Sequence, residues 1–272
     1  KKIRKNGCNY KKMKIVFSNT YKNININEYL VNLIIEHNCD IIVLAEYKGN
    51  EANLKNELYI RGYEFEEYSM FACKKIKIFY NKNVRIILNN DNSNYVSFKL
   101  CRNDLEFELF AVHFPSKLYE SDDNRQFIAR TLKSDIDKIE NAVVVGDFNS
   151  NPFEKTMVAA SCLSALPTIN CINRTVQGNK IKILYNPMWK FFGDFEKFPG
   201  TYYYRKSEDI NYVWNIFDQV LVSNNLLRKF NKESVRIIRN IKGTSLIKNQ
   251  KIDKNISDHL PVFFSLKEDK DG

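Results

Sequence analysis

The sequence AVVVGDFN at residues 142–149 decides the fold. A short, nearly unbroken apolar run is typical of a strand that is buried on both faces. This run is followed by Asp147 and Asn149, so it predicts two polar side chains at a strand end. Residues 40–46, DIIVLAE, repeat the pattern with Glu46 at the end. Both runs therefore predict core strands that each bring an acid to a strand end.

Further elements surround these two runs. Apolar residues recur at helical spacing in residues 125–139 and after Asn27, and a third helix is predicted over residues 155–166. Residues 168–215 are rich in aromatic side chains without a clear period, so long loops are expected there. Strands alternating with helices indicate an α/β protein. The other predicted strands are residues 13–18, 75–80, 95–100, 107–113, 217–223, 234–240 and 261–266.

Bulk composition excludes several classes of protein. Apolar residues make up 44% of the 272 residues, which is enough for a packed core and excludes a disordered chain. The longest apolar runs are far shorter than the roughly 20 residues that a bilayer requires. No linker-like stretch or repeat is visible, so we expect one domain over residues 13–267 and a basic N-terminal extension over residues 1–12. No apolar leader follows that basic start, so we expect a cytoplasmic protein. We also expect a monomer.

The charge balance favours a polyanionic partner. Lys plus Arg number 42 and Asp plus Glu number 32, which gives a net charge of +10. Clustered Lys and Arg side chains attract phosphates. The heavy use of Lys, Ile and Asn also fits a compositional bias that produces a solvated, lysine-rich surface. Charge alone therefore places nucleic acid only slightly ahead of no polyanion.

Polar residues beside the apolar strands carry the chemistry. His113 and His259 are two of only three histidines, and both lie where a predicted strand ends or begins, whereas His37 is expected at a helix C-terminus. A carboxylate at the end of an apolar run must be paired or bound to a metal. A hard cation such as Mg²⁺ prefers such carboxylates. Four acids fit this description and predict a convergent metal and acid/base site: Glu46, Asp147, Asp218 and Asp258.

The order of these motifs resembles the endonuclease/exonuclease/phosphatase superfamily over residues 13–267, nearly the whole chain. The superfamily includes pancreatic-type deoxyribonuclease and abasic-site endonucleases, and this chain looks like a bacterial-type member. The resemblance implies a four-layer α/β/β/α sandwich with two mixed β-sheets. It also implies hydrolysis of a phosphate ester with Mg²⁺ or Mn²⁺. The motifs that carry it are Asn19, DIIVLAE to Glu46, FAVH to His113, GDFN at 146–149, DQVLVS from Asp218, and SDH at 257–259.

The resemblance assigns roles to individual residues. It implies metal contacts for Glu46, Asn19 and Asp258. Asp147 matches the residue that positions or deprotonates the attacking water, and the sequence does not decide between Asp147 and His259 as general base. The other implied catalytic residues are His113, Asn149, which matches a phosphate-contacting residue, and Asp218, which matches an acid that orients a histidine. Arg125 resembles an arginine that starts a helix in the family, and it is equally readable as a helix-surface residue.

The substrate is predicted from the aromatic segment before Asp218. Tyr204 and Trp214 could stack on bases while Arg205 and Lys206 hold phosphates, or the aromatic rings could instead fill the core. Arg125 is also predicted to bind the substrate. We expect a nuclease or other phosphodiesterase acting on DNA or RNA, and the sequence leaves open whether it is an endonuclease or an exonuclease. The first alternative is a phosphatase or phosphodiesterase acting on a lipid or inositol phosphate. The second is a DNA-binding or RNA-binding module without activity, which the intact set of acids and histidines disfavours.

Overall fold

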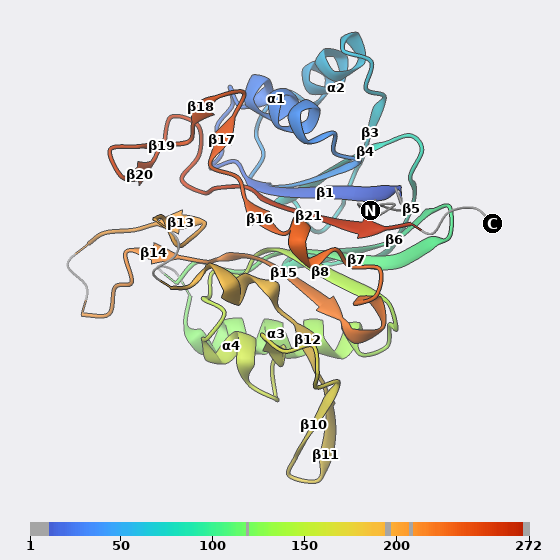
Figure 1. Cartoon of the computed structure of the whole chain (residues 1–272), viewed down its shortest axis with the longest axis vertical. Coiled ribbons are helices and arrows are strands. Elements are labelled where there is room, and N and C mark those ends of the chain that lie inside the picture. The colour runs from blue at the N-terminus through green and yellow to red at the C-terminus, as the bar shows by residue number, and fades with distance from the viewer. Residues whose placement is uncertain (1–10, 118–119, 194–196, 207–208, 269–272) are drawn as a thin grey trace, which may run out of the picture.

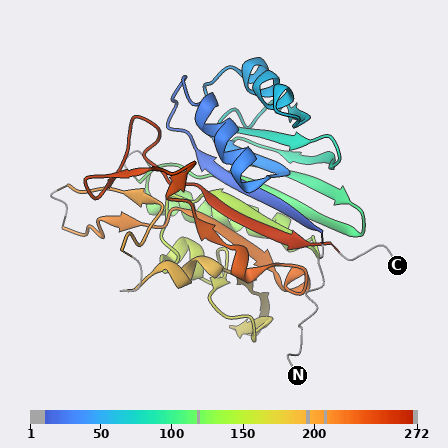
Figure 2. The same ribbon diagram turned by 45° about the horizontal axis from the view of Figure 1, so that its top comes forward.

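Two β-sheets packed face to face form the centre of the protein in the computed structural model (Figure 1). The structure describes residues 11–117, 120–193, 197–206 and 209–268. Helices α1 and α2 cover the outer face of one sheet, and α3 and α4 cover the outer face of the other (Figures 1 and 2). The predicted four-layer α/β/β/α sandwich is confirmed. Most of the predicted N-terminal extension, residues 1–10, lies outside the described residues.

The first sheet has six strands in the order β16-β21-β1-β2-β4-β3. Strands β1 and β2 are parallel, and a parallel pair requires a crossover connection, which α1 provides at Asn27–His37. Helix α2, Glu51–Ile60, follows β2. The strands are β1 Lys12–Asn19, β2 Ile41–Ala45, β3 Phe65–Tyr68, β4 Ile76–Asn81, β16 Arg236–Ile237 and β21 Val262–Lys267.

The second sheet has seven strands in the order β5-β6-β7-β8-β15-β12-β9. Its parallel pair is β7 and β8, connected by helix α3 at Asp122–Ile136, so this sheet is mixed as well. A short helix, α4 Lys155–Val158, follows β8. The strands are β5 Arg85–Asp91, β6 Tyr95–Arg102, β7 Leu105–His113, β8 Ala142–Asp147, β9 Ala165–Leu166, β12 Leu184–Tyr185 and β15 Asp218–Ser223.

Strand β8 is apolar on both faces because it separates two cores. Val143 and Val145 belong to the large core between the sheets. Val144 points the other way and belongs to the smaller core beneath α3 and α4. Successive side chains of a strand point to opposite faces, so a strand between two cores needs a continuous apolar run. The run AVVVG meets that need.

Several predicted elements differ in the structure. The helix predicted over residues 155–166 is only the single turn α4, and the strand predicted over 234–240 pairs with β21 only at β16. Short two-stranded ribbons occupy much of the segment predicted as loops. No helix of the described chain is long and apolar enough to cross a membrane. The short elements are β10 Asn173–Val176, β11 Asn179–Lys182, β13 Tyr202–Tyr203, β14 Trp214–Asn215, β17 Asn240–Ile241, β18 Thr244–Ser245, β19 Ile247–Lys248, β20 Lys251–Ile252, η1 Pro187–Phe191, η2 Asn224–Leu226 and η3 Lys232–Ser234.

Gly146 pairs with Val112 of the neighbouring strand β7, directly before Asp147. Its φ is +152°, and a Cβ atom at this position would lie 2.0 Å from the backbone oxygen of Val112. Backbone cannot yield as a flexible side chain can, so a larger residue would push β7 and β8 apart. The register that aligns His113 with Asp147 therefore requires glycine here.

We predict that Gly146→Ala lowers the free energy of unfolding by about 3 kcal/mol, because the added methyl group overlaps backbone. Urea unfolding followed by circular dichroism measures the change. The matched control is Gly178→Ala, where φ is +79° and no atom lies within 4 Å of the added Cβ. Only backbone strain of about 1 kcal/mol is expected there. Equal losses in the two variants would contradict the close-approach argument.

Candidate active site

Three polar residues of the second sheet form one row across adjacent strands. His113 ends β7, Asp147 ends β8 and Asp218 begins β15, and the register pairs Asp147 with both of the others. Paired residues on neighbouring strands project to the same face of a sheet. The three apolar strands thus bring an imidazole and two carboxylates together at one edge of the sheet.

The first sheet adds two residues from the ends of β1 and β2. Asn19 pairs in register with Ala45, and Glu46 follows directly in a left-handed conformation with φ 54°. The Asn19 Nδ2 atom donates a hydrogen bond to Asp147 Oδ2 at 3.2 Å. The Glu46 carboxylate lies 3.2 Å from His113 Nε2. The two sheets therefore meet at these side chains, beyond the region where β1 and β2 pack against β8.

The loop before β21 completes the group. His259 Nδ1 is 2.7 Å from Asp218 Oδ2, and Nε2 is 3.8 Å from an oxygen of Asp147 and 3.8 Å from one of Asp258. Ser257 holds this loop in place, because its hydroxyl donates to the backbone oxygen of Asn19 at 2.7 Å and accepts from the His259 amide at 3.1 Å. Seven of the eight predicted catalytic and metal-binding residues therefore lie in one cluster.

Asn149 lies at the same edge, one turn beyond β8. Its backbone amide donates to Asp147 Oδ1 at 2.8 Å, and its Nδ2 donates to the backbone oxygen of Phe114 at 2.9 Å. Its φ of 46° is left-handed, a conformation that asparagine tolerates better than most residues. The turn thereby binds the Asp147 oxygen that Asn19 does not contact and places Asn149 in the lining of the cleft described below.

The close packing of charged groups in the cluster shifts the pKa values of its histidine and carboxyl side chains. Burial alone would lower the pKa of His259, but the carboxylates of Asp218, Asp147 and Asp258 outweigh burial and raise that pKa to about 10. Burial raises the pKa of the Asp147 carboxyl, although the nearby imidazole of His259 opposes the effect. The hydrogen bond from His113 lowers the pKa of Glu46. At neutral pH the site therefore holds the His259 imidazolium and an ionised Glu46 carboxylate.

Two sets of side chains could hold a cation. Asp147, Asp218 and His259 offer ligand atoms within 4.8 Å of one another. A ligating imidazole must be neutral, and the raised pKa of His259 disfavours that set. Glu46, Asp258 and Asn19 instead offer carboxylate and amide oxygens at the wall of an open cleft. Oxygen donors next to solvent fit a hard divalent cation that keeps part of its water shell.

The cluster forms the floor of a cleft of about 890 Å³. Strand β13 and the β19–β20 ribbon line it, on the side of the sandwich where the β13–β14 ribbon also projects (Figure 1). Among the predicted substrate-binding residues, Tyr204 and Arg205 line this cleft. Its walls carry six cationic side chains against four acidic ones, so an anionic ligand is favoured: the cations are Lys22, Arg205, Lys206, Lys248, Lys251 and Lys254.

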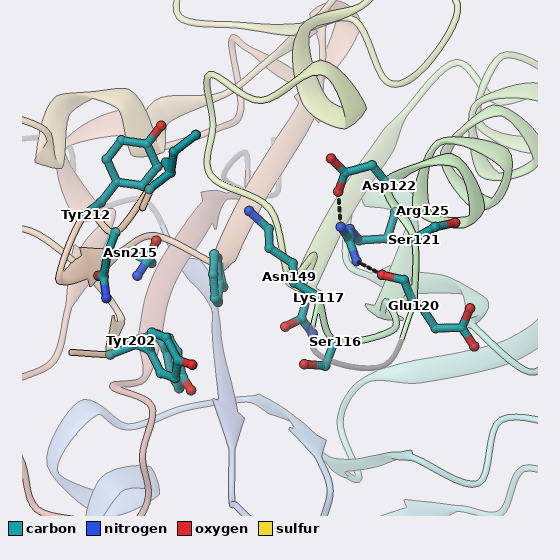
Figure 3. A pocket seen from close by; sticks show the side chains of 14 residues that line it. Ser116, Lys117, Glu120, Ser121, Asp122, Arg125, Asn149, Tyr202, Tyr212 and Asn215 are labelled. Carbon is teal, nitrogen blue, oxygen red and sulfur yellow. Dashed lines mark hydrogen bonds and ion pairs between the residues drawn. The ribbon is translucent and has the colours of Figure 1, made fainter. Parts of the chain in front are cut away.

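A smaller pocket of about 450 Å³ adjoins the cleft (Figure 3). It shares Ser116, Asn149, Tyr202 and Tyr204 with the cleft. Arg125 forms part of its wall, and its buried guanidinium contacts the Asp122 carboxylate and donates to the backbone oxygen of Glu120 at 3.0 Å. Arg125 is thus a neighbour of the acidic cluster and not a member of it.

Trp214 lines none of these cavities. Its ring packs on Tyr203 and Phe198, with ring centroids 5.1 and 5.5 Å away. Thr201 and Tyr202, which were not among the predicted site residues, lie closer to the chemistry. Thr201 Oγ1 accepts a hydrogen bond from the Asp218 amide at 3.1 Å, and the Tyr202 ring lies 4.7 Å from the His259 ring. The signal available in the sequence was the glycine-threonine pair before the tyrosines, which marks a turn.

Comparison with known proteins identifies the family. The family model described as "Endonuclease/Exonuclease/phosphatase family" matches residues 61–268, more than half of the chain. A search of curated protein sequences gives no significant match.

Solved structures share the fold over nearly the whole chain at low sequence identity. D. rerio TDP2 complexed with a single-strand DNA product is 16% identical, with a TM-score of 0.59 over 94% of this chain and 99% of that one. The 3′ phosphatase NExo from Neisseria, bound to a product DNA hairpin, is 15% identical, with a TM-score of 0.52 over 94% and 100%.

The inositol polyphosphate 5-phosphatase domain of SpSynaptojanin, in complex with inositol (1,4)-bisphosphate and calcium, is 16% identical, with a TM-score of 0.52 over 95% of this chain and 84% of that one. These likenesses concern the fold, and the family match covers the segment that carries His113, Asp147, Asp218 and His259. The chain belongs to the endonuclease/exonuclease/phosphatase family, which unites hydrolases of phosphate esters.

Proposed function

We propose that this protein is a divalent-metal-dependent nuclease that hydrolyses phosphodiester bonds of DNA or RNA. The observation that carries the proposal is the position of Asp147. This buried carboxylate lies 3.8 Å from His259 Nε2 and 4.0 Å from His113 Nε2, at the floor of a cationic cleft. A carboxylate held between imidazoles beside an anion-binding cleft suits water-mediated attack on phosphorus.

Glu46, Asp258 and Asn19 are the residues proposed to hold the metal, because they offer oxygen donors at the cleft wall. A bound Mg²⁺ or Mn²⁺ would neutralise charge on the phosphate and polarise its P–O bonds. His113 holds the Glu46 carboxylate in place through their 3.2 Å contact. The low pKa of Glu46 keeps that carboxylate ionised and able to bind a cation.

The chain's own residues divide the proton chemistry between them. His259 is cationic at neutral pH, so it can donate a hydrogen bond from Nε2 to a non-bridging phosphate oxygen and cannot accept a proton. Asp147 is therefore the residue that orients the attacking water and accepts its proton. Its raised pKa favours that role. Asp218 holds the imidazole in position through the 2.7 Å contact at Nδ1.

Two features favour nucleic acid as the substrate. The six cationic side chains that line the cleft, Lys22 and Lys254 among them, suit a phosphate backbone. The adjoining pocket is lined by Tyr202, Tyr204, Tyr212 and Phe217, and such rings can stack on bases (Figure 3). Two similar structures, TDP2 and NExo, contain DNA.

An inositol phosphate phosphatase is the second candidate, because the cationic cleft also fits a small polyanion and the SpSynaptojanin domain binds an inositol bisphosphate. Release of inorganic phosphate from inositol polyphosphates, without cleavage of DNA or RNA, would favour this candidate over the nuclease.

We predict that Asp147→Asn and His259→Ala each lower kcat on labelled DNA or RNA by about 1,000-fold or more, because each removes a group that acts on the reacting atoms. Single-turnover rates with excess enzyme measure the loss, and thermal unfolding confirms that the fold persists. His37→Ala is the matched control, since this histidine lies outside the cleft and contacts Arg236. A rate within tenfold of the wild type in either variant would refute the mechanism.

We predict that Glu46→Gln raises the Mg²⁺ concentration required for half-maximal activity by about tenfold or more, because the variant loses a charged ligand. Activity is titrated with Mg²⁺ and with Mn²⁺. Glu51→Gln serves as control, because Glu51 of α2 forms an ion pair with Lys77 of β4 and does not line the cleft. An unchanged metal requirement in Glu46→Gln would remove Glu46 from the metal site.

The raised pKa of His259 also predicts how stability depends on pH. The stabilisation from its charge is fully present below the unfolded pKa, near 6.5, and is lost as the pH rises towards 10. In EDTA, the difference in unfolding free energy between the wild type and His259→Gln should shrink by roughly 3 kcal/mol between pH 6.5 and 10. Urea unfolding at several pH values measures it.

The control for this pH dependence is His37→Gln. Burial lowers the pKa of His37, so its imidazole is neutral above pH 7 in the folded and unfolded chain alike. Its difference from the wild type should therefore stay constant between about pH 7.5 and 10. A constant difference for His259→Gln would show that this imidazole is not held in its charged form.

A further inference from the structure

We propose that a second cationic groove, on the side of the active site opposite the main cleft, also binds the polynucleotide. The polynucleotide is then cleaved internally and not from an end. This inference rests on the proposed nuclease function and adds a binding site and a cleavage mode. The groove has a volume of about 640 Å³ and shares Lys22, Glu46, His113 and Ser116 with the main cleft.

Three lysines belong to this groove and not to the main cleft: Lys48, Lys74 and Lys75. All three are exposed. Within the described part of the chain, none of the three ammonium nitrogens lies within 4.0 Å of a carboxylate oxygen, so none forms an ion pair there. Such ammonium groups are available to phosphates, and displacing the counterions of a nucleic acid favours binding. The groove also contains the amides of Asn94 and Asn124, which can donate hydrogen bonds to a sugar-phosphate backbone.

The loop that carries Lys74 and Lys75 is fixed in place. The Asp91 carboxylate accepts hydrogen bonds from the backbone amides of Phe71, Ala72 and Cys73 at 2.7, 2.9 and 2.8 Å. The backbone oxygen of Lys75 accepts a hydrogen bond from the Glu46 amide at 2.8 Å. The lysines therefore start from a backbone already aligned with the metal site, which reduces the entropy lost when they bind a ligand.

The sheet topology places the groove and the main cleft on opposite sides of the site. In the first sheet, β4 follows Lys75 on one side of β2, whereas β1 and β21 lie on the other side. In the second sheet, β5 and β6 lie on one side of β7, whereas β8 and β15 lie on the other. The groove includes the β5–β6 turn at Ser93 and Asn94, and the main cleft includes Asp147 and His259.

A ligand with one or a few clustered phosphates could contact the cations of only one of the two surfaces, the groove or the main cleft. A polynucleotide has a phosphate at every nucleotide, so it can contact Lys48, Lys74 and Lys75 on one side and Arg205, Lys206 and Lys251 on the other. The scissile phosphate then lies between two bound flanks. Cleavage at that point is internal, and no chain end is required.

Binding tests the groove directly. The triple variant Lys48→Gln, Lys74→Gln, Lys75→Gln is compared with Lys180→Gln, Arg228→Gln, Lys232→Gln, which removes three exposed cations that line none of these cavities. Fluorescein-labelled 30-nucleotide single strands of DNA and RNA are titrated in EDTA at several salt concentrations. The groove variant should bind at least about tenfold more weakly, and its slope of log K against log salt should decrease by about 2.

Equal affinities and slopes for the two triple variants would overturn the groove assignment. Stronger binding of wild-type protein to vesicles containing phosphatidylserine than to either strand would also overturn it, and would indicate a membrane surface instead.

Covalently closed circular single strands of DNA and RNA test the cleavage mode, because they have no ends. The wild type should linearise at least one kind of circle, and the groove variant should do so at least about tenfold more slowly. Both should hydrolyse bis(p-nitrophenyl) phosphate at rates within about twofold, since this small diester does not reach the lysines. Intact circles beside degraded linear strands would overturn internal cleavage.

The small diester also separates this inference from the function on which it rests. Failure of the wild type to hydrolyse the diester and every polynucleotide would refute the proposed nuclease, and internal cleavage with it. A lysine-dependent loss of strand binding would still support the groove as a polynucleotide site in that case.

Discussion

Burial of the Asp147 carboxylate is the constraint on which the site depends. This side chain is only 2% exposed, and a buried charge is tolerated only when it is paired and hydrogen-bonded. Its partners come from both sheets and from the C-terminal loop: the Asn19 amide, the Asn149 backbone amide and the imidazoles of His113 and His259. Asp147 therefore links distant parts of the chain, and the same contacts that satisfy its charge bring the reactive groups together.

The pairing of His259 with Asp218 has a chemical consequence beyond stability. Asp218 is fully buried, so its carboxylate acts on the imidazole with little screening by water. The imidazole is held charged, and the mechanism we propose therefore assigns proton acceptance to Asp147. Thr201 supports this division, because it binds the Asp218 amide through its hydroxyl and the Leu260 amide through its backbone oxygen. One turn thus fixes both members of the pair.

The sequence predicted the sheet core and the acidic cluster because both depend on the same local pattern, an apolar run that ends in a polar residue. It could not show the register that sets His113, Asp147 and Asp218 in one row, since strand pairing joins residues far apart in the chain. Helix α2 was missed because only Leu54 and Leu58 are buried in it, which gives a weak helical period. Edge strand β5 was missed because it has no fully buried residue. Arg125, in the first turn of α3, and Trp214, in β14, are placed relative to the cleft by long-range packing, for which the sequence offers no period to follow.

The division between sheets and loops explains why the chemistry is easier to infer than the substrate. Glu46, His113, Asp147 and Asp218 lie at or next to strand ends, where backbone pairing fixes them. Arg205, Lys251 and Lys74 lie in ribbons and loops around that edge, where residues can change without disturbing the core. Lys74 is a partial exception, because Asp91 holds its loop through three backbone amides. A loop held this firmly next to Glu46 gives the proposed groove a preformed backbone, so the lysines can be tested by substitution without rebuilding the sheet edge that carries the acidic cluster.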